Sequence, residues 1–122
     1  MIIDPNNVAW IVKDPLGRTI SLSNELADIR ESVGKHTGNE FLSRMDAKET
    51  VINPDRIDIS SNNPKRDIYY RSRGKIEIGP YERVVVEMDG DYGEAISWSI
   101  YDKPVSSSGV RYWKGGQPWR HI

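Results

Sequence analysis

The chain has 122 residues, which suits one domain and leaves little room for two. Its 17 Lys and Arg residues nearly balance its 18 Asp and Glu residues. The resulting formal net charge of −1 excludes a uniformly basic nucleic-acid coat but not a local basic site. The absence of cysteine excludes disulfides, thiolate zinc sites and cysteine nucleophiles.

Hydrophobic residues make up 37% of the chain and charged residues 29%, proportions typical of a soluble globular domain. No apolar run approaches the ~20 residues needed to span a bilayer. Residues 1–5 lack the charged and apolar regions of a signal peptide. We therefore expect one domain over residues 1–122 that makes no membrane contact, with the cytoplasm as its default compartment.

The first elements predicted are a small β-hairpin and two helices. Residues 8–12 and 18–20 are expected to be strands, joined by the turn sequence Asp-Pro-Leu-Gly at 14–17. Apolar residues then recur at helical spacing from Leu22 to Val33, with Ser23 as N-cap and Gly34 as stop. A second helix is predicted by the capping-box spacing of Thr37, Gly38, Asn39 and Glu40, and it ends at Asn53 and Pro54.

The second half of the chain has the two-residue period of strands. Strands are predicted at 67–72, 75–78, 82–88, 94–101 and 110–113. Their connections are too short for parallel crossovers, so we expect an antiparallel meander. The predicted fold is therefore α+β: two N-terminal helices packed on one face of an antiparallel sheet, with a small N-terminal β-hairpin.

Alternation along the strands predicts which side chains enter the core. We expect Ser97, Ser99 and Tyr101 to share the free face of the sheet, because the bulky residues of their strand have the opposite parity. The expected core consists of Leu26, Ile29, Val33, Phe41, Met45, Val85, Ile96, Trp98 and Ile100.

A basic stretch from Lys65 to Lys75 contains two adjacent tyrosines, Tyr69 and Tyr70. Arginine can clamp a phosphate bidentately, and tyrosine can stack on an unpaired base or donate through its hydroxyl. An ordinary solvated strand and turn explains the same run of charges, and the residues alone favour that explanation.

The sequence gives no pattern for metal or cofactor binding, and we expect neither. The two histidines, His36 and His121, lack partners at metal-ligand spacing, and the Asp89–Asp91 segment is typical of a turn. No Walker loop, dinucleotide fingerprint or nucleophile elbow is present. His36 lies at the junction between the predicted helices. It would act there as a general acid or base, or it is an exposed loop residue, which is the interpretation that composition favours.

Five segments in the same order resemble phage-associated nucleases of the BECR fold, a superfamily named after barnase, EndoU, the colicin nucleases and RelE. They are DPLGRTISL at 14–22, ETVINPDRI at 49–57, KRDIYYR at 65–71, VVVE at 84–87 and ISWSIYDK at 96–103. The resemblance implies a single nuclease-like domain of toxin type, which cleaves RNA without a metal through attack of the ribose 2′-OH on the adjacent phosphate.

The resemblance also implies site residues. Arg71, Ser99 and Tyr101 match catalytic positions, and His36 matches the histidine of a helix corner. Asp28 stands where the family has a second helix histidine. We expect Arg71, Ser99 and Tyr101 to line one shallow cleft on the free face. Residues assigned to substrate binding are Lys65, Arg66, Tyr69, Arg73 and Lys103, with Arg66 and Lys103 at the rim of the cleft.

An alternative is a catalytically inactive phage or mobile-element protein that uses the same face to bind RNA or a protein partner. The partner implied for a toxin, besides RNA, is an antitoxin or immunity protein, whose acidic surface would cover residues 65–75. Such a toxin would act in the cytoplasm of a bacterium or phage-infected host, or be delivered into a target cell.

Overall fold

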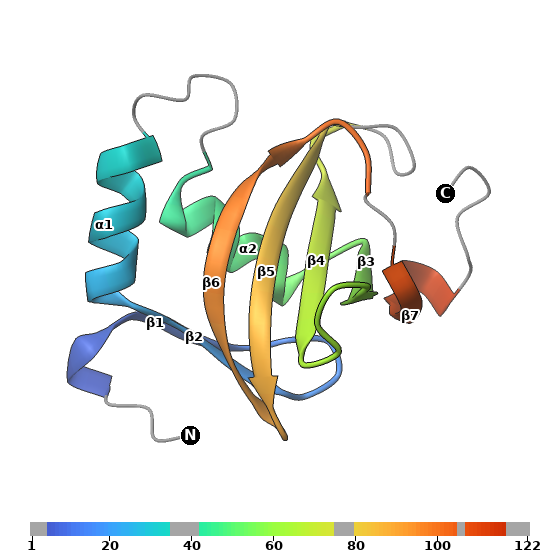
Figure 1. The fold of residues 1–122 in the computed structure, drawn as a ribbon, viewed down its shortest axis with the longest axis horizontal. Coiled ribbons are helices and arrows are strands. Elements are labelled where there is room, and N and C mark those ends of the chain that lie inside the picture. The colour runs from blue at the N-terminus through green and yellow to red at the C-terminus, as the bar shows by residue number, and fades with distance from the viewer. Residues whose placement is uncertain (1–4, 35–41, 75–79, 105–106, 117–122) are drawn as a thin grey trace.

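A computed structural model describes residues 5–34, 42–74, 80–104 and 107–116. These residues form one seven-stranded sheet and two α-helices, which confirms the predicted α+β class (Figure 1). In chain order the elements are β1 (Val8–Lys13), β2 (Thr19–Ser23), α1 (Asn24–Gly34), α2 (Arg44–Ile52), β3 (Arg56–Ser60), β4 (Arg66–Ser72), β5 (Tyr81–Asp89), β6 (Tyr92–Tyr101) and β7 (Ser107–Trp113).

The strands lie in the order β1-β2-β6-β5-β4-β3-β7. The predicted meander is present from β4 to β6, and neighbouring strands are antiparallel throughout except for β2 and β6, which pair in parallel. The prediction of a purely antiparallel sheet was therefore wrong, because the N-terminal hairpin joins the main sheet beside β6. The predicted strand at 75–78 lies outside the described residues.

The N-terminal hairpin and the start of α1 follow the local signals in the sequence. Gly17 has a φ of 81°, a left-handed conformation that suits glycine in the turn between β1 and β2. The Ser23 hydroxyl accepts a hydrogen bond from the Leu26 amide at 3.1 Å, as expected of an N-cap. The cap of α2 is Ser43, whose hydroxyl accepts from the Asp46 amide. The predicted capping box at 37–40 lies outside the described residues.

The main core lies between the helices and one face of the sheet, and α2 runs behind β4, β5 and β6 in Figure 1. Trp98 and Ile100 pack against it as predicted. Ile29 and Met45 were wrongly assigned to it, since they are 54% and 55% exposed. Phe41 lies outside the described residues, and the main core consists of Trp10, Ile20, Leu22, Ala27, Leu42, Ala47, Val51, Ile57, Tyr69, Val84, Val86 and Ala95.

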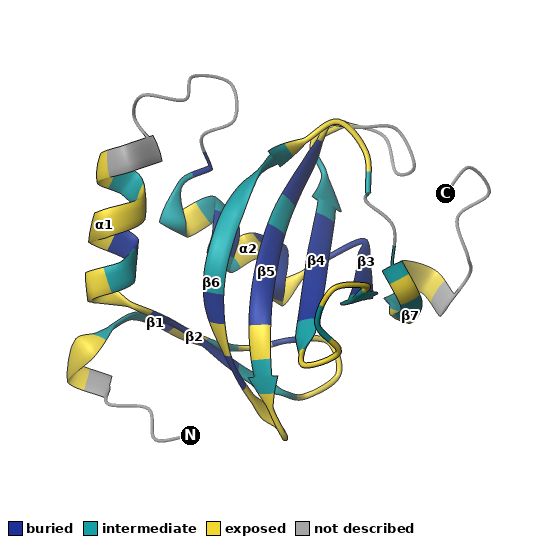
Figure 2. Cartoon of the chain, in the orientation of Figure 1, coloured by how far each residue is buried: buried dark blue, intermediate teal, exposed yellow. Residues whose placement is uncertain are grey.

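The face of the sheet opposite α2, which we call the open face, carries a second and smaller core. It consists of Ile68, Tyr70, Tyr81 and Val85, with Ile96 and Trp113 packed against it. Figure 2 shows β4 and most of β5 as buried, whereas the upper part of β6 is intermediate. Ile96 joins this core rather than the predicted one because a bulge interrupts the pairing of β6 between Val85 and Val86. The open face is therefore polar mainly along β6.

We expect Gly93→Ala to lower the free energy of unfolding by about 1–3 kcal/mol, because it overfills a packed region. A Cβ at Gly93 would lie 2.5 Å from Met88 Sδ, 2.6 Å from Val86 Cγ1 and 3.0 Å from Ile20 Cδ1. Gly74→Ala is the matched control, since nothing lies within 4 Å of its Cβ position. Urea denaturation measures both variants, and equal stabilities would contradict this close packing.

Candidate functional site

The strand register separates the residues that the sequence placed in one cleft. Arg71 lies opposite Glu82, which lies opposite Ile100, and Ile100 packs against the main core. Directly paired residues share a face of the sheet, so Arg71 is on the helix side. Ser99 and Tyr101 have the opposite parity and lie on the open face. The predicted common cleft of these three residues is therefore wrong, and His36 lies outside the described residues.

Arg71 is already bound to a carboxylate. Its Nη2 lies 2.8 Å from Oε1 of Glu82, and its Nε lies 3.1 Å from the same oxygen. The Glu82 carboxylate also receives a hydrogen bond from the Thr50 hydroxyl at 3.3 Å. The shallow hollow beside Arg71 is lined by Asp46, Arg71, Ser72, Arg73 and Glu82, so its two cations face two anions. This hollow has no excess positive charge with which to hold a phosphate.

A different arginine accompanies Ser99 and Tyr101 on the open face. Arg83 of β5 lies directly opposite Ser99, and its guanidinium carbon lies 4.4 Å from the centre of the Tyr101 ring. Arg83 Nε is buried and has no hydrogen-bond partner among the described residues. Tyr101 remains 38% exposed. We call Arg83, Ser99 and Tyr101 the open-face site.

The open-face site presents groups that suit a phosphate. A guanidinium offers charge-assisted hydrogen bonds to phosphate oxygens, and the two hydroxyls add neutral donors. Arg83 is partly exposed, but its Nε has almost no accessible surface, so a phosphate would have to bind through the other guanidinium nitrogens. The described part of the chain contains no histidine, since His36 and His121 both lie outside it.

Arg83 was not predicted from the sequence, although the alternation of β5 carried part of the signal. In β5, Val84 and Val86 share one parity and Arg83 has the other. Aligning β5 against β6 as a short hairpin, with its turn at 90–91, would pair Arg83 with Trp98, and the bulge at Ile96 shifts its partner to Ser99. The basic stretch at 65–75 gives a stronger local signal than this single arginine does.

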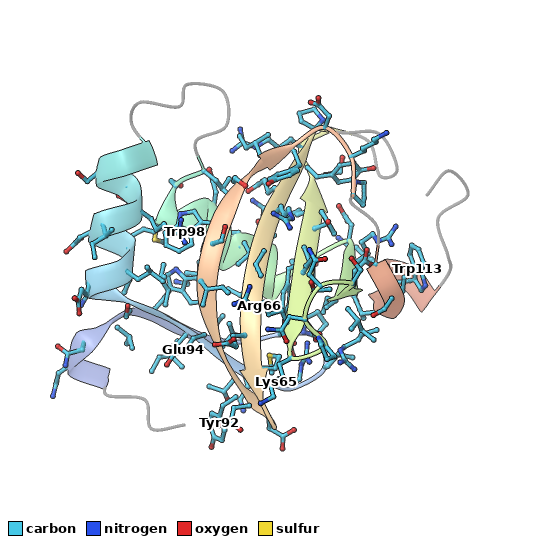
Figure 3. All side chains as sticks on the ribbon, viewed as in Figure 1. Lys65, Arg66, Tyr92, Glu94, Trp98 and Trp113 are labelled. Carbon is cyan, nitrogen blue, oxygen red and sulfur yellow. The ribbon has the colours of Figure 1, made fainter. Side chains whose placement is uncertain are left out.

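The residues predicted to bind substrate do not form one patch. Lys65 and Lys103 are exposed, and Arg66 lies on the open face with its Nε 3.6 Å from Glu87 (Figure 3). Arg73 lies on the helix side, where it pairs with Asp46 at 3.3 Å. The positive surface expected over 65–75 is therefore divided between two faces and partly neutralised by carboxylates.

Tyr69, also predicted to bind substrate, is fully buried in the main core. Its hydroxyl donates to Asp14 Oδ2 at 2.5 Å and accepts from Arg18 Nη2 at 2.9 Å. Arg18 Nη1 also binds Asp67 at 2.7 Å, and Asp67 is bound in turn by Arg111. Tyr69 thus belongs to a buried polar network that joins the β1–β2 turn to β4 and β7, and it is too deep to contact a substrate.

The network changes the proton affinity of two of its members. Burial opposes the charge of Arg18, but Tyr69, Asp67 and Asp14 outweigh it and raise the pKa of the guanidinium. Burial raises the pKa of the Tyr69 hydroxyl well above its usual value of 10.0; Arg18 opposes this shift, and the hydrogen bond and charge of Asp14 add to it. Tyr69 is therefore a neutral donor in the folded protein.

We expect the raised pKa of Tyr69 to make the protein less stable as the pH rises above about 10. Above that pH the unfolded chain loses the tyrosine proton while the folded chain keeps it, so unfolding is favoured by proton release. Urea denaturation between neutral pH and pH about 11 measures the effect. Tyr69→Phe removes this contribution, so an equally steep loss of stability in that variant would contradict the assignment.

Within the described ranges, no three His, Asp or Glu side chains are grouped to hold a metal ion. No helix in the described part of the chain has the length and hydropathy needed to cross a membrane. No family model, curated protein or solved structure matches this chain.

Proposed function

We propose that this protein is a metal-independent endoribonuclease of toxin type that binds the scissile phosphate at the open-face site. The observation that carries the proposal is the position of Arg83, which is partly exposed and lies with Ser99 and Tyr101 on one face. The ordered resemblance of five segments to BECR nucleases supports the same reaction class. It also supports assigning the hairpin, the two helices and the β4–β6 meander to a BECR-like fold.

The proposed reaction is a transesterification. The ribose 2′-oxygen loses its proton to a base and attacks the adjacent phosphorus, while the bond from phosphorus to the 5′-oxygen breaks. The leaving 5′-oxygen takes a proton, which leaves a 2′,3′-cyclic phosphate and a 5′-hydroxyl. Arg83 stabilises the charge that builds on the phosphoryl oxygens, and the Ser99 and Tyr101 hydroxyls donate to them. The resemblance places His36 among the catalytic residues, where it would act as a general acid or base.

A second candidate is a binding protein that has lost catalysis. Asp28, which stands in place of a family histidine, has its carboxylate 2.7 Å from Arg44 Nη2. Arg44 also binds Glu31. The Asp28 carboxylate therefore pairs with a cation of α2 and does not supply the chemistry of that histidine, which favours a protein that binds RNA without cleaving it.

One assay separates the two candidates. Purified full-length protein is incubated with mixed-sequence RNA in the presence of EDTA, and the products are tested for 2′,3′-cyclic phosphate ends. We expect such ends to form with the wild type. Binding without cleavage would support the second candidate, and neither binding nor cleavage would overturn both. If the chain is a toxin, its antitoxin or immunity protein should block the same assay by covering the open-face site.

A further inference from the structure

The open face holds a second contact between an arginine and an aromatic ring, far from the first. The guanidinium carbon of Arg56 lies 4.5 Å from the centre of the Trp113 ring. Asp58 fixes that guanidinium through two hydrogen bonds of 2.8 Å, and both residues of this ion pair are almost fully buried. Trp113 itself is partly exposed, at the outer edge of the sheet on β7 (Figure 3).

The strand register connects this contact to the open-face site. Trp113 lies opposite Arg56, Arg56 opposite Tyr70, Tyr70 opposite Arg83, and Arg83 opposite Ser99. These five residues therefore form one row across five strands on the same face, in which Arg56 and Tyr70 are buried and the two ends, Trp113 and Arg83 with Ser99, are partly exposed. Three inter-strand steps separate Trp113 from Arg83, a path of about 14 Å along the sheet.

We propose that Trp113 stacks on a nucleobase of a single-stranded RNA whose phosphate lies at Arg83. This inference rests on the proposed function and adds a second contact point for the same ligand. Sheets that bind RNA commonly stack unpaired bases on aromatic side chains, while cationic groups hold the backbone. The row supplies both kinds of group at a spacing of a few nucleotides.

The surroundings of Trp113 favour a base over a cationic peptide. Arg56 already supplies a cation to the ring, so a second cation would meet positive charge behind the indole. Asp58 neutralises Arg56 and is itself buried, so it offers no exposed anion to a basic peptide. Lys114 follows Trp113 and is 42% exposed; its Nζ lies 3.9 Å from Asp55, a long contact that leaves its exposed side able to meet a polyanion at the edge of the sheet.

The test compares two uncleavable RNAs of different length, a dinucleotide and a hexanucleotide that carry 2′-O-methyl groups. The two bases of a dinucleotide directly flank its one phosphate, so they do not reach Trp113 when that phosphate is at Arg83. We expect Trp113→Ala to weaken hexanucleotide binding by about 5-fold to 150-fold and to leave dinucleotide binding unchanged. Arg83→Ala should weaken both. Affinities come from fluorescence anisotropy or calorimetry.

Two further variants control for folding and for nonspecific aromatic contact. Trp113→Phe keeps a ring on Arg56 and should retain most of the hexanucleotide affinity, even if Trp113→Ala unfolds. Tyr92→Ala removes an aromatic side chain that is 47% exposed but lies outside the row, and it should bind both RNAs as the wild type does.

Each result has a distinct meaning. Wild-type hexanucleotide affinity in a folded Trp113→Ala variant would overturn the stacking contact. An equal loss of affinity for the dinucleotide would also overturn it. So would a Trp113→Phe variant that binds the hexanucleotide no better than an unfolded chain does, while Tyr92→Ala binds it as the wild type does. If Arg83→Ala keeps full affinity for both RNAs while Trp113→Ala loses the longer one, the phosphate assignment fails and the stacking contact stands.

Discussion

The Arg83→Ala variant should cleave RNA at least about 100-fold more slowly than the wild type, the scale expected for the loss of one charge-stabilising donor. Arg83 supplies the cation of the open-face site, where Ser99 and Tyr101 share its face. Arg83→Lys should restore only part of the activity, because lysine cannot present a planar, bidentate fork. The measurement is the initial rate of RNA cleavage in EDTA at saturating enzyme.

Arg71→Ala is the control for this prediction, because Arg71 lies on the other face and is bound to Glu82. We expect it to lower stability, since it leaves a buried carboxylate without its main partner, but to cleave within a few-fold of the wild type while folded. Circular dichroism at the assay temperature establishes that each variant is folded. Loss of cleavage in Arg71→Ala together with full activity in Arg83→Ala would reverse the assignment.

Local signals predicted much of the fold correctly. The turn at 14–17, the N-cap Ser23 and the alternation from Ser97 to Tyr101 each depend on a few neighbouring residues and are present in the structure, whereas the bulge at Ile96 breaks the predicted alternation of β6. The same alternation placed Ser99 and Tyr101 on the open face. Features that depend on distant pairing were missed, such as the parallel contact of β2 with β6 and the pairing of β7 with β3.

The strand β3 and the face of Arg71 were missed for physical reasons. Arg56 and Asp58 gave β3 a polar sequence, but they neutralise each other and are buried. In β4 the adjacent residues Tyr69 and Tyr70 are both fully buried, because the sheet has a core on each side. Alternation in β4 therefore carried no information about which face is open, and only the register with β5 assigns Arg71 to the helix side.

The largest expected effect on stability is that of Arg18→Ala, which should lower the free energy of unfolding by about 3–5 kcal/mol. The Arg18 guanidinium lies 2.8 Å from Asp14 and 2.7 Å from Asp67, and both carboxylate side chains are fully buried. Its removal leaves two anions in the protein interior with fewer compensating charges. Arg44→Ala is the matched control, since Arg44 binds Asp28 and Glu31 side chains that are 72% and 24% exposed rather than buried, and it should cost about 1 kcal/mol.

Urea denaturation of the two variants measures the difference, and a double-mutant cycle assigns its cause. Asp14→Asn keeps the Oδ1 acceptor that binds the Leu16 and Arg18 amides but removes a buried charge. In the Arg18→Ala background this second substitution should therefore cost much less than it does in the wild type. Equal costs in the two backgrounds, or an Arg18→Ala variant no less stable than Arg44→Ala, would show that the buried charges are not what Arg18 stabilises.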